Sequence, residues 1–182
     1  MNNVVIRGLS GKLGQLVILS DGHLRTRPDV SKRVWSERQR EHLSRFEQAK
    51  AYARTVMADP ALHAKYAAKA ARSHGLGVWQ LAIADFFHPP RILSVMPDPN
   101  CGEQGSRVVI RAVDDFQVAG AEVTIGSDTG LLEQGAAAVD PATGSWVYTL
   151  AGDLPRGVDI RITVTVADLP GNRTEKTVSC VF

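Results

Sequence analysis

From residue 91 onward, apolar and polar residues alternate with the period of two that is typical of half-buried β-strands. Seven segments have this pattern and are predicted as strands: residues 91–96, 107–113, 118–125, 130–133, 145–150, 158–166 and 174–181. The alternation is clearest where Ile160, Ile162 and Val164 fall on one face. Pro170-Gly171 indicates a type II turn between the last two strands. This half of the chain is therefore predicted to be an all-β sandwich.

The middle of the chain has the spacing of apolar residues that is typical of amphipathic helices. Ser36 and Gln39 form a capping box at the start of the first helix, because each side chain can bond the other residue's backbone N–H. Asp59-Pro60 combines a capping carboxylate with proline at the first helical position, which predicts the start of a second helix. A third helix is predicted over residues 78–87.

The N-terminal segment has two short apolar runs, residues 4–6 and 16–19, on either side of a glycine-rich stretch at residues 8–14. We interpret the glycine-rich stretch as a sharply turning loop, since glycine gives the backbone the freedom that such a turn needs. Asp21-Gly22 is a strong hairpin signal, and residues 23–27 are predicted as the returning strand. These features predict a small β-meander with an exposed edge.

Together these elements predict an α+β chain: an N-terminal small β-meander plus a three-helix unit, followed by an all-β immunoglobulin-like sandwich. The boundary is placed at Pro89-Pro90, because two consecutive prolines cannot continue a helix and form a stiff hinge. The predicted domains are residues 1–90, a β-meander and helical assembly domain, and residues 91–182, the sandwich.

Composition and net charge indicate which classes of function suit this chain. The 182 residues are 44% hydrophobic and 22% charged, which is typical of a folded globular chain. Residues 1–90 contain 14 basic and 7 acidic side chains, for a net charge of +7, whereas residues 91–182 contain 7 basic and 12 acidic ones, for −5. The two halves are therefore electrostatically complementary to each other, and so to other copies of the chain.

No apolar run reaches the ~20 residues that a membrane-spanning helix needs. Arg7, Ser10, Lys12 and Gln15 interrupt the apolar stretches of the first twenty residues, so we expect synthesis in the cytoplasm without a Sec signal peptide. An extracellular or particle-associated location, reached after lysis or through a specialised export apparatus, stays open.

Three stretches of the second half are similar to bacterial immunoglobulin-like domains: residues 114–121 (DDFQVAGA), 146–148 (WVY) and 167–172 (ADLPGN). Domains of that family are usually spacers or adhesive modules rather than catalysts. The resemblance implies that this half could also recognise a surface glycan or a protein.

The first half resembles uncharacterised bacterial and phage-associated proteins of a structural type. The shared pattern consists of residues 8–14, Arg25-x-Arg27-Pro28, Gln39-Arg40 with Phe46, residues 58–62, and Asp85-Phe86 with Pro89-Pro90. The resemblance implies a component of a particle or filament.

We find no catalytic set in the sequence and predict that the protein is not an enzyme. Lys12 lacks the spacing and the following Ser or Thr of a phosphate-binding loop. No serine lies in a G-x-S-x-G motif. The five histidines are scattered without a metal-ligand spacing, although a site assembled across helices stays open.

Two sets of residues could be structural sites of the sandwich. Asp114, Asp115, Asp168 and Asn172 are expected at the same pole, facing the Pro89-Pro90 hinge, where their oxygens could bind Ca²⁺. The competing interpretation is that they nucleate turns by bonding their own backbone. No other cofactor is predicted. Cys101 and Cys180 are expected near each other and form a candidate disulfide, with two free thiols as the alternative.

We predict a self-assembling structural protein, the subunit of a filament, tube or phage-like particle built by head-to-tail and β-edge contacts between copies. The candidate assembly residues are basic or aromatic: Arg25, Arg27, Arg38, Arg40, Arg45, Trp35, Trp79 and Phe87. A monomeric immunoglobulin-like binding module is the first alternative. Nucleic acid binding is less favoured, because glutamates at positions 37, 41 and 47 alternate with the arginines at helical spacing.

Overall fold

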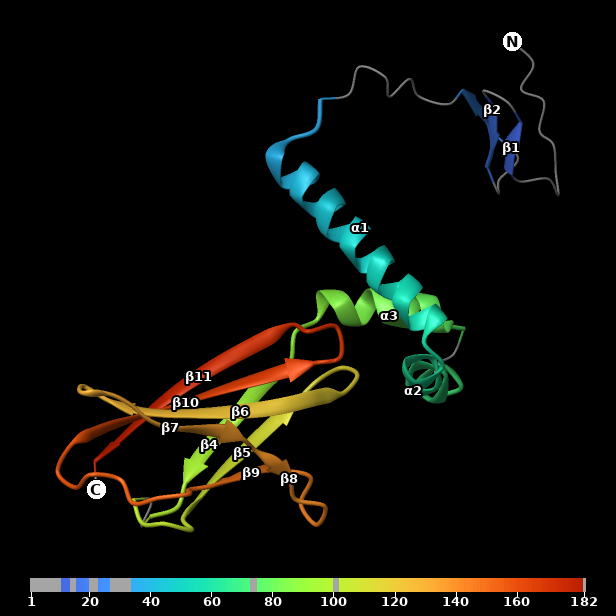
Figure 1. The fold of residues 1–182 in the computed structure, drawn as a ribbon. Coiled ribbons are helices and arrows are strands. Elements are labelled where there is room, and N and C mark those ends of the chain that lie inside the picture. The colour runs from blue at the N-terminus through green and yellow to red at the C-terminus, as the bar shows by residue number, and fades with distance from the viewer. Residues whose placement is uncertain are drawn as a thin grey trace. The chain divides into compact units, whose positions relative to one another are not determined.

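The computed structural model describes residues 11–13, 16–19, 23–26, 34–72, 75–99 and 102–181, and over these residues the chain is α+β (Figure 1). The chain divides into two compact units, Met1–Leu43 and Ser44–Phe182. The first contains a small sheet, and the second contains the helices α2 and α3 together with all later strands. Helix α1 begins in the first unit and ends in the second.

The small sheet is an antiparallel meander of β1 (Gly11–Leu13), β2 (Leu16–Ile18) and β3 (Leu24–Thr26). The expected loop at residues 8–14 is corrected in part, because residues 11–13 pair with β2 as a strand. Gly11 has a φ of 140°, a conformation open to glycine, so the same residue that indicated a turn begins a strand. Residues 4–6 and Asp21-Gly22 lie outside the described part of the chain.

Three helices follow: α1 (Glu37–Ala58), α2 (Pro60–Ala70) and α3 (Val78–Phe87). The predicted capping box is confirmed, since Ser36 N donates to Gln39 Oε1 at 3.0 Å and Gln39 N donates to Ser36 Oγ at 3.3 Å. Asp59 caps α2 as predicted, accepting from Ala61 N and Leu62 N through Oδ1 at 2.8 and 3.2 Å. None of these helices is long and apolar enough to cross a membrane.

The helices share a small core formed by one face of each: Ala53, Val56, Tyr66, Leu81 and Ala82 are buried there. Only the second half of α1 contributes to it, because every side chain from residue 37 to 48 is exposed. The apolar stripe of α1 therefore has a buried end and an uncovered end.

The strands of the second half are, in order, β4 (Arg91–Pro97), β5 (Arg107–Val113), β6 (Val118–Ser127), β7 (Gly130–Ala136), β8 (Ala138–Val139), β9 (Trp146–Thr149), β10 (Asp159–Asp168) and β11 (Arg173–Val181). Seven of them correspond to the predicted strands. The two-residue strand β8 was not predicted, because it is too short to show any periodicity. Pairing is antiparallel throughout, in a sheet of order β11-β10-β6-β7 and a sheet of order β4-β5-β9-β8.

Both sheets bury their inner faces in one core, an arrangement compatible with a β-sandwich. The alternation predicted for β10 is confirmed, since Ile160, Ile162, Val164 and Val166 are all fully buried. Gly171 has a φ of 91°, and its N–H donates to the Asp168 carbonyl oxygen at 3.3 Å, so the predicted turn is present with glycine at its left-handed position. Gly135 lets the Tyr148 ring approach β7, because a Cβ there would lie 2.8 Å from Tyr148 Cε2.

The domain boundary at Pro89-Pro90 stays a prediction, and the contacts of these two prolines are described by the structure. Pro90 is buried, and its carbonyl oxygen accepts a hydrogen bond from Thr174 Oγ1 of β11 at 2.5 Å. Pro89-Pro90 does end α3, but the chain on either side of it packs into the same compact unit. Polar contacts at the end of the sandwich hold the helices and strands together there.

Candidate functional site

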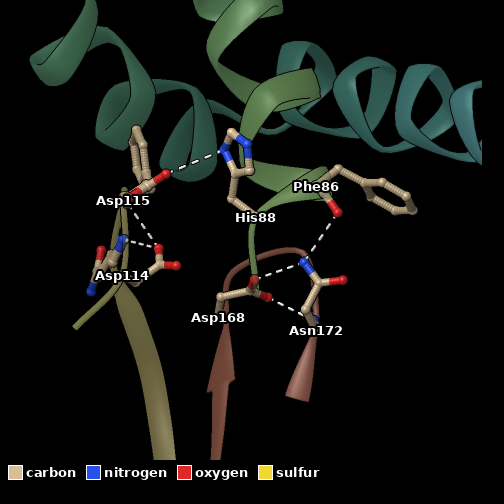
Figure 2. Close-up of polar contacts among 8 residues, drawn as sticks. Phe86, His88, Asp114, Asp115, Asp168 and Asn172 are labelled. Carbon is tan, nitrogen blue, oxygen red and sulfur yellow. Dashed lines mark hydrogen bonds and ion pairs between the residues drawn. The ribbon is translucent and has the colours of Figure 1, made fainter. Parts of the chain in front are cut away.

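The candidate site is the pole of the sandwich at which α3 enters, which we call the junction. Two connections meet α3 there, the β5–β6 loop with Asp114 and Asp115, and the β10–β11 turn with Asp168 and Asn172 (Figure 2). The structure therefore places these four residues at one end of the sandwich, facing the segment that contains Pro89-Pro90.

Asn172 connects the β10–β11 turn to α3. Its Nδ2 donates to the Asp168 carboxylate (Oδ2) at 2.7 Å and to the Phe86 carbonyl oxygen at 3.2 Å. Its backbone N–H donates to Asp168 Oδ1 at 2.7 Å. Asp168 is only 3% exposed. Both of its carboxylate oxygens are thus occupied by one neighbour, which fixes the turn and aims the amide of Asn172 at the helix (Figure 2).

Asp114 shapes the other connection. Its Oδ2 accepts from the backbone N–H groups of Phe116 and Gln117, each at 2.8 Å, which is an Asx-type turn. The turn presents Phe116 to α2, where the Phe116 and Tyr66 rings stack with centroids 4.0 Å apart. Lys69 Nζ lies 4.9 Å from the centroid of the Phe116 ring. One carboxylate thus positions an aromatic anchor between a loop of the sandwich and the helices.

Asp115 has a different environment. Its Oδ2 lies 3.2 Å from His88 Nδ1, just after α3, and the two side chains are 64% and 58% exposed. An ion pair this exposed contributes little to stability. It marks the rim of the junction rather than its interior.

The interior of the junction contains a chain of hydrogen bonds among residues that the sequence analysis did not identify. Tyr52 of α1 bonds Tyr66 of α2 through the two hydroxyls at 2.8 Å, and the Tyr66 hydroxyl donates a short hydrogen bond to Asp85 Oδ2 of α3. Tyr66 is fully buried and Asp85 is 3% exposed. Each of the three helices therefore contributes one polar group to a buried network.

Burial raises the pKa of Asp85 to about 7. The hydrogen bond from Tyr66 and the charge of Lys69 act in the opposite direction, whereas the carboxylates of Asp114 and Asp168 raise the pKa further. Burial also raises the pKa of Asp168, against the bonds from Asn172 that lower it. The junction thus brings together the carboxyl groups of Asp85, Asp114 and Asp168, whose negative charges repel one another.

Two carboxyl oxygens at the junction, Asp85 Oδ1 and Asp114 Oδ1, are buried without a hydrogen-bond partner within the part of the chain that the structure describes. Beside Asp85 lies a hollow of about 210 Å³, lined in part by Lys69, Phe116 and His88. An unpaired buried carboxylate is costly, and taking up a proton removes most of that cost. The geometry and the raised pKa of Asp85 both favour its neutral form.

The predicted calcium residues come together only in part. The oxygens of Asp114 and Asp168 accept the turn bonds described above, whereas Asp115 pairs with His88. Over the described ranges, no three His, Cys, Asp or Glu side chains are grouped so that they could hold a metal ion. Calcium binding stays a prediction, and turn formation accounts for the bonds seen.

The predicted assembly residues fall into three groups. Arg45 and Phe87 are in contact, with the Arg45 guanidinium 5.4 Å from the ring centroid, and Phe46 stacks on the same ring at 6.4 Å. Trp79 is half-buried and packs against the helical core. The remaining described residues of the set are exposed: Arg25, Trp35, Arg38 and Arg40. Arg27 lies outside the described residues.

The candidate disulfide stays a prediction, because Cys101 lies outside the described residues. Cys180 is half-buried near the end of β11, with its sulfur 3.9 Å from the Ile160 carbonyl oxygen. Burial raises the pKa of the Cys180 thiol, which disfavours the reactive thiolate.

No protein-family model matches the chain, and no curated protein matches it. Among solved structures, the crystal structure of a conjugative transposon lipoprotein from Bacteroides eggerthii DSM 20697 is similar at 17% sequence identity. The match covers 50% of this chain and 92% of that one, with a TM-score of 0.26.

One signal in the sequence could have indicated the buried network. Asp85 follows Leu81 and Ala82 by four and three residues, so it falls on the apolar face of the third predicted helix. A carboxylate at such a position needs a partner or a raised pKa. Its partner Tyr66 could not be found in this way, because the two residues meet only through the packing of two helices.

Replacing Asn172 with alanine should lower the free energy of unfolding by about 1–3 kcal/mol, because it leaves the buried Asp168 carboxylate without its side-chain partner. It also removes the hydrogen bond to the Phe86 carbonyl oxygen. Thermal unfolding followed by circular dichroism measures the effect. Gln117→Ala, on the other loop of the junction with an exposed side chain, is the matched control. Equal melting temperatures for the two variants would contradict a connecting role for Asn172.

Proposed function

We propose that the protein is a self-assembling structural subunit, and that its N-terminal unit is completed by another copy of the chain. The observation that carries this proposal is that the described residues of that unit form no buried core. Its three strands have three residues each, and none of the side chains described between residues 11 and 43 is buried. A three-stranded sheet needs a packed face for stability in water. A second copy can supply that face.

Exposed apolar side chains lie in the N-terminal sheet and in the first half of α1. Leu16 and Leu24 in the sheet are each 39% exposed, and Leu43 and Phe46 on α1 are 43% and 38% exposed. Burying such side chains against a partner is favourable by roughly 25 cal/mol for each Å² removed from water. The first turns of α1, up to Leu43, are thus a second surface suited to contact between copies, whereas Phe46 already stacks on Phe87 with part of its ring exposed.

Charge supports a copy of the same chain as the partner. The net charge of +7 over residues 1–90 and of −5 over residues 91–182 favours contacts in which the first half of one copy meets the second half of the next. Such a contact is heterologous, so its repetition gives a ring or an open filament.

The sandwich itself we propose to be immunoglobulin-like. Labelled A to G along the chain, with β7 as C′, its strands have the orders A-B-E-D and G-F-C-C′, which are the two sheets of that fold. In this proposal the sandwich is a rigid spacer, and the junction fixes its orientation on the helices. An immunoglobulin-like adhesion module acting as a monomer is the outcome that the following experiment separates from assembly.

Assembly is tested by measuring the mass and shape of the full-length protein. We expect oligomers in sedimentation velocity and in negative-stain micrographs at micromolar concentration and low salt. Association should weaken between 0.05 and 1 M salt, because the screening length falls from above ~10 Å to ~3 Å. A monodisperse monomer throughout this range would refute the proposal.

Reversing the charge of Arg38, Arg40 and Arg45 to glutamate should weaken association without unfolding the chain. Arg38 and Arg40 are exposed on α1, whereas Arg45 also lies over the Phe87 ring. The test therefore includes a second variant that reverses only Arg38 and Arg40. We expect at least a tenfold loss for the triple variant, about 1.4 kcal/mol of association free energy, with an unchanged circular dichroism spectrum. Full association of both variants would show that these charges do not contribute.

A further inference from the structure

The sandwich has four edge strands, and they differ in how well they are protected. The sheet orders place β11 and β7 at the edges of one sheet and β4 and β8 at the edges of the other. A free edge presents unpaired backbone N–H and C=O groups, which another strand can extend. Proteins that do not use such an edge block it with charges, proline, short length or a covering segment.

Three of the four edges have such protection. β4 and β11 are held together by side chains of β11, since Lys176 Nζ donates to the Leu93 carbonyl oxygen at 3.3 Å and Thr174 Oγ1 donates to that of Pro90 at 2.5 Å. β4 also ends in Pro97. β8 is only two residues long. Each of these edges is poorly suited to accept a further strand.

β7 is the least protected of the four edges, with one charged residue, Glu133, and one bulge near its start. It has seven residues, without proline or lysine, and lies outside β6 at the margin of its sheet (Figure 1). Leu131 and Leu132 are 64% and 38% exposed. A bulge at this end leaves Leu132 without a partner in the ladder between Leu131 and Glu133, whereas Glu133 to Ala136 keep a regular register with β6. The regular part has four residues, one more than each strand of the N-terminal sheet.

The charge around β7 indicates what it would accept. Residues 118–139, which span β6, β7 and β8, contain three carboxylates, Glu122, Asp128 and Glu133, and no lysine or arginine. Asp128 pairs with Arg161 of β10, whereas Glu122 and Glu133 have only uncharged hydrogen-bond donors in the described contacts. Residues 1–28 contain four basic side chains and one acidic side chain. The N-terminal sheet ends in the edge strand β3, whose Leu24 and Arg25 are exposed. Among the described strands, β3 is thus a basic, apolar edge that matches the acidic, apolar edge at β7.

We propose that the edge of β7 in one copy pairs with β3 of a second copy, so that the N-terminal sheet extends the sandwich sheet of its neighbour. This inference rests on the proposed self-assembly and names the surfaces that would carry it. Backbone hydrogen bonds between the strands supply the affinity, and Leu131 and Leu132 bury against the apolar residues of the incoming sheet. We call β3 the donor strand and the edge of β7 the acceptor edge. Because these are different surfaces of the chain, each added copy presents a new acceptor edge to the next copy.

Two full-length variants test the pairing. Leu131→Lys/Leu132→Lys blocks the acceptor edge in the way that natural edges are blocked. Leu24→Glu/Arg25→Glu blocks the donor strand and reverses its charge. We expect each variant alone to associate at least about tenfold more weakly than the natural protein in sedimentation velocity. The matched control is Val181→Lys/Leu93→Lys, whose residues are 64% and 55% exposed on the protected edges and which should assemble normally.

Mixing the two variants decides between pairing within and between copies. The acceptor-blocked variant keeps a free donor, and the donor-blocked variant keeps a free acceptor, so the mixture should form a 1:1 dimer that grows no further. Absence of the dimer would overturn the proposal, as would normal assembly of the acceptor-blocked variant. A natural protein that never assembles would instead refute the proposed function itself.

Discussion

The unfolding free energy of the natural protein should fall as the pH rises from about 4 to about 7, and Asp85→Asn should remove most of that fall. Asp85 is 3% exposed at the junction, and its pKa is raised to about 7 from the ordinary value of 3.8. The folded state therefore binds a proton more tightly than the unfolded state. The stability gained from this proton is fully present below the ordinary pKa and is lost as the pH rises through the raised one.

The expected change in unfolding free energy follows from the shift in the pKa of Asp85. A shift of about three pKa units corresponds to about 4 kcal/mol between the two ends of the window. The asparagine side chain keeps an acceptor for the Tyr66 hydroxyl but cannot ionise. The Asp85→Asn variant should therefore be more stable than the natural protein at pH 8 and lose that advantage near pH 4. Urea unfolding at a series of pH values, followed by circular dichroism, measures the difference.

The control for this measurement is Asp115→Asn, which removes a carboxylate from the same pole. Asp115 is 64% exposed and pairs with His88, so its replacement should leave the pH dependence of the natural protein in place. A smaller slope in the same direction should remain in Asp85→Asn, because the pKa of Asp168 is also raised. Parallel pH profiles for Asp85→Asn and the natural protein would show that Asp85 does not titrate in this window.

Features that depend on neighbours in sequence could be predicted from the chain alone. The capping box at Ser36 and Gln39, the Asp59-Pro60 helix start and the alternation along β10 each involve residues within a few positions of one another. Hydrogen-bond geometry and periodicity act at that range. The placement of Asp168 and Asn172 beside α3 followed from strand topology.

Features that depend on tertiary packing could not be predicted in this way. Tyr66 and Asp85 are 19 residues apart and meet only because α2 packs against α3. The bond from Thr174 to Pro90 likewise joins residues 84 positions apart, so no local pattern in the sequence indicates it. A proline pair can end a helix without loosening the chain around it.

Replacing Tyr66 with alanine should have the largest effect of any single change at the junction, about 3–5 kcal/mol of lost stability. The side chain is fully buried, stacks on Phe116 and bonds both Tyr52 and Asp85. Its removal opens a cavity and leaves the Asp85 carboxyl without its partner. Equilibrium urea unfolding measures the lost free energy of unfolding.

Two phenylalanine variants separate packing from hydrogen bonding in this effect. Tyr66→Phe keeps the ring but orphans Asp85 Oδ2, which should cost about 1–3 kcal/mol, whereas Tyr52→Phe removes only the outer bond and should cost about 1 kcal/mol. The order Tyr66→Ala, Tyr66→Phe, Tyr52→Phe is therefore expected. Tyr52→Phe could instead lower the free energy of unfolding as much as Tyr66→Phe does. The stabilisation would then belong to the whole network of Tyr52, Tyr66 and Asp85. In that case the contact between Tyr66 and Asp85 would not be the one that holds α2 to α3.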